Sequence, residues 1–132
     1  MAEKSQLLKG TLEGCILRVI SQSETYGYEI SEKLKASGLP DISEGTIYPL
    51  LMRLEKNGLI LAKQKKSPLG PKRKYYQLTE QGQQSLLQFK NNWIQITSAV
   101  KRLFTSEGDN YDELSNLESP TQDQQRAGSE AQ

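Results

Sequence analysis

The chain has 132 residues, of which 35% are hydrophobic and 25% charged, with one cysteine and no histidine. This length suits one domain with an appended arm or tail, and the low apolar fraction predicts either a disordered part or a core that a second copy completes. Histidine-dependent catalysis and His-ligated metal sites are excluded, and a lone Cys15 cannot form an internal disulfide or a CxxC site. No apolar run reaches the roughly 20 residues that span a bilayer, and residues 1–10 lack a signal-peptide pattern. We therefore expect a cytoplasmic protein that needs no cofactor and no metal.

The net charge of +1 conceals an uneven distribution along the chain. Residues 107–132 contain seven acidic residues and one basic residue, a net charge of −6. The other 106 residues contain 16 basic and nine acidic residues, a net charge of +7. A basic body followed by an acidic segment indicates a polyanionic partner, often nucleic acid.

The first helix is predicted over residues 6–21, where several apolar residues follow the i, i+3, i+4 and i+7 spacing of one helical face. Gly10 and Gly14 each lower the helix propensity by about 1 kcal/mol relative to alanine, and such small residues allow another helix to approach closely. Cys15 lies within the apolar pattern, which favours a core position over a role as a nucleophile.

Two more helices are predicted in the next part of the chain. One runs over residues 26–36, starting at residue 26 or 27, and the other runs over residues 43–57 with Ser43 as its N-cap. Pro49 lies inside the second helix, so that either this helix is kinked there or its regular part begins near Thr46. The inward face of this helix consists of Ile47, Leu50, Leu51 and Leu54.

Residues 59–65 and 74–78 are predicted to be two strands, because β-prone residues lie on either side of a turn cluster at residues 67–71. Joined by a loop of about six residues, the two strands would form a hairpin. Basic residues lie on both sides of its tip: Lys65, Lys66, Lys72, Arg73 and Lys74.

A last helix is predicted over residues 80–105, with Thr79 as its cap. Six apolar residues recur along it at spacings of three and four, which is a heptad seam too short to stand as a free coiled coil. The seam consists of Leu86, Phe89, Trp93, Ile96, Val100 and Leu103. Residues 106–132 are poor in large apolar residues and are predicted to form a disordered acidic tail.

The order of helices followed by a basic hairpin is that of a winged helix-turn-helix, a mainly α fold with a small β-hairpin as the wing. Residues 53–74 contain eight basic residues and one acidic residue, a net charge of +7. Contact with the DNA backbone or the adjacent minor groove fits such a density, because neutralised phosphates release counterions. A solvated face that keeps the protein soluble is the plainer alternative.

The helix at residues 43–57 is the candidate for contact with base edges, because its apolar side chains turn inward. Its outward positions carry hydroxyl groups, an aromatic ring and two basic side chains. The candidate DNA-binding residues in this helix are Ser43, Gly45, Thr46, Tyr48, Arg53 and Lys56. A capping role for Ser43 and a packing role for Tyr48 are the alternatives.

Four runs of residues resemble the PadR family of bacterial transcriptional regulators. They are YGYEI at 26–30, EGTIYPLL at 44–51, RLEKNGLI at 53–60 and GPKRKYYQLTEQG at 70–82. The likeness extends in unbroken order over about residues 6–104 and leaves the acidic tail outside.

The resemblance implies a homodimer that binds double-stranded DNA and represses its own or nearby promoters. The C-terminal helix would pair with its mate and with the first helix, which would bury the heptad seam. A two-fold dimer implies a pseudo-palindromic operator, with Tyr48, Lys72 and Arg73 among the main DNA contacts. We accordingly divide the chain into a winged helix-turn-helix DNA-binding domain at 1–78, a dimerisation helix at 79–105 and the tail at 106–132.

Trp93 either packs in the seam or, as the resemblance implies for some members, stacks on a flat small-molecule effector. A winged-helix module that regulates through protein contacts is the alternative function, whereas an enzyme is disfavoured because the acids and Cys15 have no partner base. The opposite charges of tail and body predict weak intramolecular competition for the basic surface.

Overall fold

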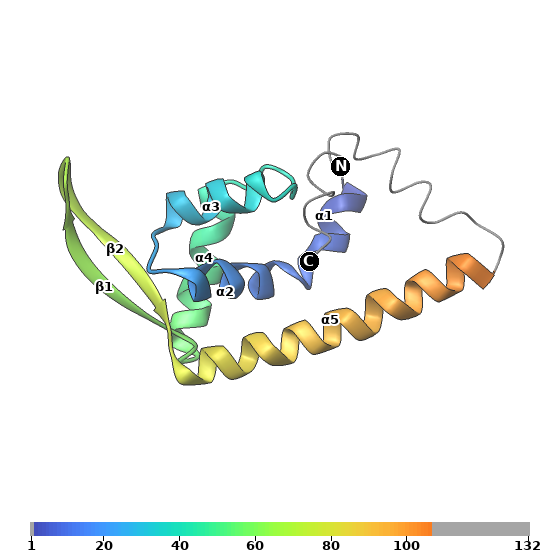
Figure 1. The fold of residues 1–132 in the computed structure, drawn as a ribbon. Helices are drawn as coiled ribbons and strands as arrows, with labels where there is room; N and C mark the ends of the chain where they lie inside the picture. The colour runs from blue at the N-terminus through green and yellow to red at the C-terminus, as the bar shows by residue number, and fades with distance from the viewer. Residues whose placement is uncertain (1, 107–132) are drawn as a thin grey trace, which may run out of the picture. The chain divides into compact units, whose positions relative to one another are not determined.

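The computed structural model describes residues 2–106, which form helices and one hairpin (Figure 1). The elements in chain order are α1 (Ala2–Lys9), α2 (Leu12–Gln22), α3 (Gly27–Ala36), α4 (Glu44–Lys56), β1 (Ile60–Ser67), β2 (Gly70–Leu78) and α5 (Glu80–Ser106). Residues 1–91 form one compact unit, and a second unit begins at residue 92, within α5. Of the tail expected to be disordered, residues 106–132, Ser106 is the last residue of α5, and the rest lie outside the described part.

The single helix predicted over residues 6–21 is wrong, because two helices, α1 and α2, occupy this region. Both the backbone N–H and the hydroxyl of Thr11 donate to the carbonyl of Leu8, at 2.9 and 3.0 Å. In a continuous helix that carbonyl would accept from the N–H of Leu12. The flexible Gly10 lies in the turn, where its low helix propensity favours the interruption.

The helices α3 and α4 lie where the sequence predicts them. The Ser43 hydroxyl accepts the N–H of Thr46 at 3.3 Å and so caps α4. The helix then continues from Glu44 through Pro49, so its regular part does not begin at Thr46. Pro49 leaves the carbonyl of Gly45 without its helical donor, and Gly45 is exposed, so water can bind there.

The strands β1 and β2 pair antiparallel and are longer than predicted. Pairing extends to Ser67 opposite Gly70, with a register shift just before this pair. Only Pro68 and Leu69 remain between the strands, so the expected loop of six residues is wrong. The Ser67 hydroxyl donates to the carbonyl of Pro71 at 2.9 Å, and this local bond closes the tip more tightly than the Pro- and Gly-rich sequence indicated.

The core of the first unit lies between α2, α3, α4 and the inner end of the hairpin. Its fully buried apolar residues come from each of these elements: Ile16, Ile30, Ile47, Leu51, Leu54 and Ile60. Cys15 is partly buried against this core, as predicted, and burial raises the pKa of its thiol. The hairpin extends away from the helices of this unit (Figure 1), so most of it receives no support from the core.

The helix α5 begins at its predicted cap and ends at Ser106. The Thr79 hydroxyl accepts the N–H of Gly82 at 3.0 Å. One turn of α2 lies close against α5, because a Cβ at Gly14 would be only 2.4 Å from the ring of Phe89. This is the close approach between helices that the small residues predicted.

Candidate nucleic-acid interface

The outward face of α4 presents a row of exposed side chains. Tyr48 and Met52 are 42% and 64% exposed, and Lys56 follows one turn later. Residues four apart lie one above the other on a helix, so these three form a continuous stripe. Sequence analysis missed Met52, although its four-residue spacing from Tyr48 was the signal that could have found it.

The first turn of α4 contains the three small candidates. Ser43 caps the helix, as its alternative role required, and its hydroxyl lies 3.3 Å from that of Thr46. Gly45 and Thr46 are both exposed beside it. The N-terminus of α4 therefore leaves a short polar segment of the backbone exposed to solvent.

Tyr48 is also a packing residue. A Cβ at Gly27 would lie 2.7 to 2.8 Å from the hydroxyl and ring atoms of Tyr48, so the ring rests on the first residue of α3. Burial raises the pKa of Tyr48 and the Glu44 carboxylate raises it further, whereas Arg73 acts in the opposite direction. The ring and hydroxyl of Tyr48 thus pack on the first residue of α3, and the raised pKa keeps the hydroxyl protonated.

Three of the predicted DNA-binding cations form ion pairs within the chain, and two of them, Arg53 and Lys74, pair with acidic residues of α2 and α4. Arg53 donates from Nε and Nη2 to Glu13 at 2.8 and 2.5 Å, and Nζ of Lys74 lies 3.4 Å from Glu55. The Arg53 and Glu13 side chains are 61% and 35% exposed, and surface pairs of this kind contribute about 1 kcal/mol or less. Both cations can therefore exchange these partners for a phosphate at small cost.

The basic residues of the hairpin are divided between its two faces. Lys65 lies opposite Arg73, and Lys66 lies opposite Lys72. Because successive side chains of a strand point to opposite faces, these two pairs lie on different faces. Lys74 lies on the face of Lys66 and Lys72 and reaches α4 through its ion pair. The five cations that the sequence placed at one tip therefore do not form a single surface.

The pair of Lys66 and Lys72 places like charges directly opposite each other, which destabilises a hairpin. Within the described part of the chain, neither lysine forms an ion pair. A polyanion that binds here would relieve this repulsion, whereas a solvated face that keeps the protein soluble would leave it in place.

The other face of the hairpin carries an aromatic and ionic cluster, here called the Tyr26 cluster and consisting of Glu24, Tyr26, Lys65, Arg73 and Tyr75. The guanidinium carbon of Arg73 lies 4.3 Å from the centre of the Tyr26 ring, and Tyr26 meets Tyr75 edge to face at 5.3 Å. Lys65 pairs with Glu24 at 2.5 Å. Sequence analysis missed this cluster because residues 24 and 26 are far along the chain from the hairpin.

The predicted heptad seam of α5 changes character along the helix. Leu86 and Phe89 are partly buried within the first unit. In the second unit, Trp93, Ile96, Val100 and Leu103 are between 40% and 64% exposed. An apolar row this exposed is unusual for a helix in water.

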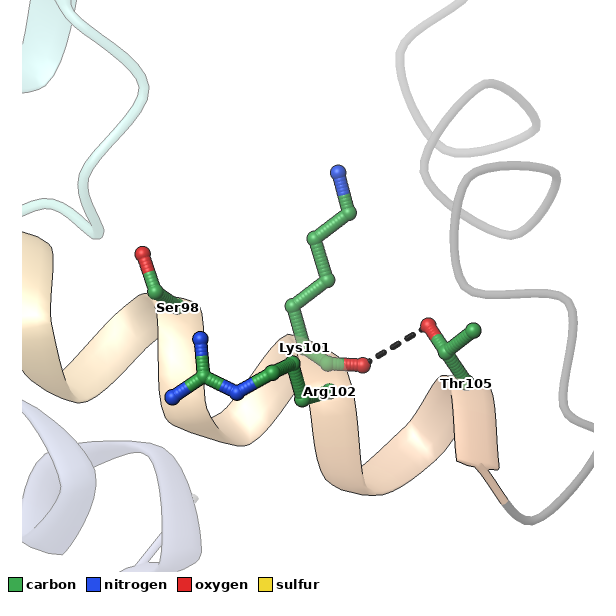
Figure 2. A pocket seen from close by; sticks show the side chains of 4 residues that line it. All are labelled: Ser98, Lys101, Arg102 and Thr105. Atoms are coloured by element: carbon green, nitrogen blue, oxygen red, sulfur yellow. Dashed lines mark hydrogen bonds between the residues drawn. The ribbon is translucent and has the colours of Figure 1, made fainter.

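A shallow hollow lies on the last turns of α5 (Figure 2). It is lined by Ser98, Lys101, Arg102 and Thr105. The Thr105 hydroxyl donates to the carbonyl of Lys101 at 2.8 Å, and Figure 2 shows the charged ends of Lys101 and Arg102 pointing apart. Within the described part of the chain, all the lining residues come from α5.

Residues 2–106 contain no group of acidic and cysteine side chains that could hold a metal ion. None of the helices in this range has an apolar stretch long enough to cross a membrane.

Comparison with known proteins identifies the family. Residues 16–88, more than half of the chain, match the Transcriptional regulator PadR-like family. The chain belongs to this family. The resemblance noted in the sequence motifs is thereby confirmed, and the winged helix-turn-helix fold with a long C-terminal helix agrees with it.

Several solved structures resemble this PadR-like chain. A PadR-like transcriptional regulator from Bacillus cereus is 53% identical, with a TM-score of 0.70 over 76% of this chain and 97% of that one. A Streptococcus transcriptional regulator is 45% identical, with a TM-score of 0.67 over 74% and 96%. A curated Lysinibacillus sphaericus protein, described as uncharacterized protein X, is 33% identical over 74% of this chain and 91% of its own length.

Proposed function

We propose that this PadR-like transcriptional regulator is a homodimeric repressor that binds a pseudo-palindromic operator through α4 and the hairpin. Family membership supplies the general role in transcription. The observation that carries the DNA-binding surface is the opposed pair Lys66 and Lys72, on the hairpin face that reaches α4 through Lys74. Phosphate contact at the hairpin and base contact at α4 can then occur on one duplex.

Different roles are proposed for the residues of this surface. The stripe of α4 reads base edges, and Met52 adds an apolar contact of the kind that recognises a thymine methyl group. The cations bind phosphates and set the register. The proposed DNA contacts are Ser43, Gly45, Thr46, Tyr48, Met52, Arg53, Lys56, Lys65, Lys66, Lys72, Arg73 and Lys74.

The exposed seam of α5 supports the homodimer. A second copy of α5 would cover Trp93, Ile96, Val100 and Leu103, which otherwise leave apolar area in water. Sedimentation equilibrium tests this directly. We expect the wild type to be a dimer and Ile96→Lys to shift towards the monomer, whereas Gln95→Lys, on an exposed position outside the seam, stays a dimer. A dimeric Ile96→Lys protein would contradict this interface.

DNA binding is tested by fluorescence anisotropy with the protein's own upstream DNA and a scrambled duplex, over a range of salt concentrations. We expect saturable preference for the upstream DNA and a steep loss of affinity with salt. Equal and weak binding to both duplexes would mean either that the operator lies elsewhere or that the chain is the alternative module, which regulates through protein contacts.

The hairpin is tested with the double variant Lys66→Ala/Lys72→Ala. Affinity for both duplexes should fall. The slope of the logarithm of the binding constant against the logarithm of the salt concentration should become shallower by about 0.9 for each phosphate that the variant no longer neutralises. Removal of the opposed charges should leave folding stability unchanged or raised. Arg18→Ala/Lys90→Ala removes the same charge from exposed positions of α2 and α5 and serves as the matched control. A loss of affinity equal to that of the control would refute the phosphate-binding role of the hairpin.

We propose the seam role for Trp93. Its second expected role, stacking on a flat effector, stays a prediction. Trp93 is the single tryptophan of the chain, so quenching of its fluorescence on titration with planar aromatic compounds tests that prediction without a label.

A further inference from the structure

The segment before α3 attaches the hairpin to the helices. Thr25 and Tyr76 exchange two backbone hydrogen bonds, at 3.3 and 2.7 Å, so residues 24–26 lie along the outer edge of β2. Thr25 itself is fully buried. Because side chains alternate, Glu24 and Tyr26 lie on the opposite face, where they meet the hairpin.

From this segment, contacts extend along both strands towards the tip. On β2, the Arg73 guanidinium lies 4.3 Å above the Tyr26 ring, and Tyr75 meets this ring at 5.3 Å with an interplanar angle of 66°. On β1, Lys65 pairs with Glu24 at 2.5 Å and lies 5.4 Å from the centre of the Tyr75 ring. The Tyr26 cluster therefore holds both strands beyond the buried residues at the core end of the sheet.

Core packing cannot hold this part of the hairpin. From residue 63 to residue 74 every side chain except Ser67 is exposed. An isolated two-stranded hairpin is marginally stable in water. The opposed lysines at positions 66 and 72 destabilise it further. The contacts of the Tyr26 cluster are thus the main side-chain restraint on the outer half of the hairpin.

We propose that Tyr26 is a positioning residue for operator recognition, acting as the centre of a clamp that orders the hairpin before DNA arrives. This inference rests on the proposed function. With the hairpin held, Lys66 and Lys72 reach phosphates while α4 lies on its bases, and no ordering entropy is lost on binding. Non-specific binding requires only net charge and needs no fixed hairpin. The clamp therefore contributes to preference for the operator more than to affinity for any duplex.

The first test compares Tyr26→Leu, which removes the ring, with Tyr26→Phe, which keeps it. Hydrogen exchange of the hairpin amides is measured without DNA, and affinity is measured for upstream and scrambled duplexes. For Tyr26→Leu we expect faster exchange in β1 and β2, about tenfold weaker binding to upstream DNA, little change with scrambled DNA and an unchanged salt dependence. Tyr26→Phe, which keeps the ring facing Arg73 and Tyr75, should lie much closer to the wild type than Tyr26→Leu in every measurement.

The second test keeps the charge and changes only the shape of the cation. Arg73→Lys removes the planar group that stacks on the ring, and Lys90→Arg makes the reverse exchange at an exposed position of α5 outside the proposed DNA contacts. We expect only Arg73→Lys to speed amide exchange in the hairpin and to lower the preference for upstream DNA. Because both positions are exposed, these variants should fold even if Tyr26→Leu does not.

The outcomes separate the clamp from the proposed function. If the wild type shows no preference for any promoter fragment, the proposed function fails and the role of the clamp in recognition fails with it. If the wild type discriminates and Arg73→Lys discriminates equally well, the clamp alone is overturned. Faster hairpin exchange with unchanged preference would also overturn it, because an ordered hairpin would then not matter for recognition.

Discussion

Substitution of the two glycines near the N-terminus should have opposite effects on stability. Sequence analysis treats Gly10 and Gly14 alike, as residues that each lower helix propensity by about 1 kcal/mol. In the structure, a Cβ at Gly10 meets nothing within 4 Å, whereas a Cβ at Gly14 would lie 2.4 to 2.5 Å from three ring atoms of Phe89. Contact between α2 and α5 therefore decides the outcome at Gly14 and has no influence at Gly10.

The magnitude follows from the overlap. Ordinary contact begins at 3.4 Å, so Phe89 must move by about 1 Å to admit alanine at Gly14. Overpacking of this kind costs about 1–3 kcal/mol, and the gain in helix propensity offsets about 1 kcal/mol. We expect Gly14→Ala to lower the free energy of unfolding by up to about 2 kcal/mol. Gly10→Ala, at a position without positive φ, should raise it by about 0.4–1 kcal/mol.

Urea denaturation followed by circular dichroism measures both effects. Protein concentration is held constant, because dimer formation is coupled to folding. The double variant Gly14→Ala/Phe89→Leu makes room for the added methyl group and should recover part of the loss. The reasoning would be refuted by a Gly14→Ala protein as stable as Gly10→Ala, since the ring of Phe89 would then not press on α2.

Three further predictions test other parts of the molecule. Gly82→Ala should lower the free energy of unfolding by about 2–4 kcal/mol in the same assay. The added Cβ would overlap the backbone carbonyl oxygen of Leu59, and a backbone group cannot rotate away as a flexible side chain can. A loss below about 1 kcal/mol would contradict this overlap. Glu13→Gln should strengthen DNA binding in the anisotropy assay, because it frees Arg53 from its ion pair. The free energy of unfolding should fall by less than about 1 kcal/mol. In an Arg53→Ala protein the same substitution should leave the DNA affinity unchanged. Cys15 should react with a disulfide reagent at pH 8 more slowly than in the urea-unfolded chain, because burial raises its pKa and lowers the thiolate fraction; equal rates would argue against the partly buried position.

The local pattern of the sequence was enough for most of the fold. Apolar spacing and capping residues located α3, α4 and α5, because these signals act within a few residues of each other. They also indicated the hairpin, the heptad seam and the family motifs. The failures were local as well: the bonds from Thr11 to Leu8 divided the first helix, and the Ser67 bond to Pro71 shortened the tip.

The arrangement of the candidate site depended on tertiary structure. Sequence alone grouped the basic residues at one tip, but strand register assigned Lys66 and Lys72 to one face and Arg73 to the other. The pairing of Arg53 with Glu13 spans 40 positions of the chain, and Tyr26 meets Arg73 across a similar separation. Such partners follow no periodicity, since only the folded chain brings them together. The sequence by itself determined which charges the protein carries, because charge depends only on residue identity. The tertiary contacts of Glu13, Glu24 and Glu55 decided which of the basic side chains are paired within the chain.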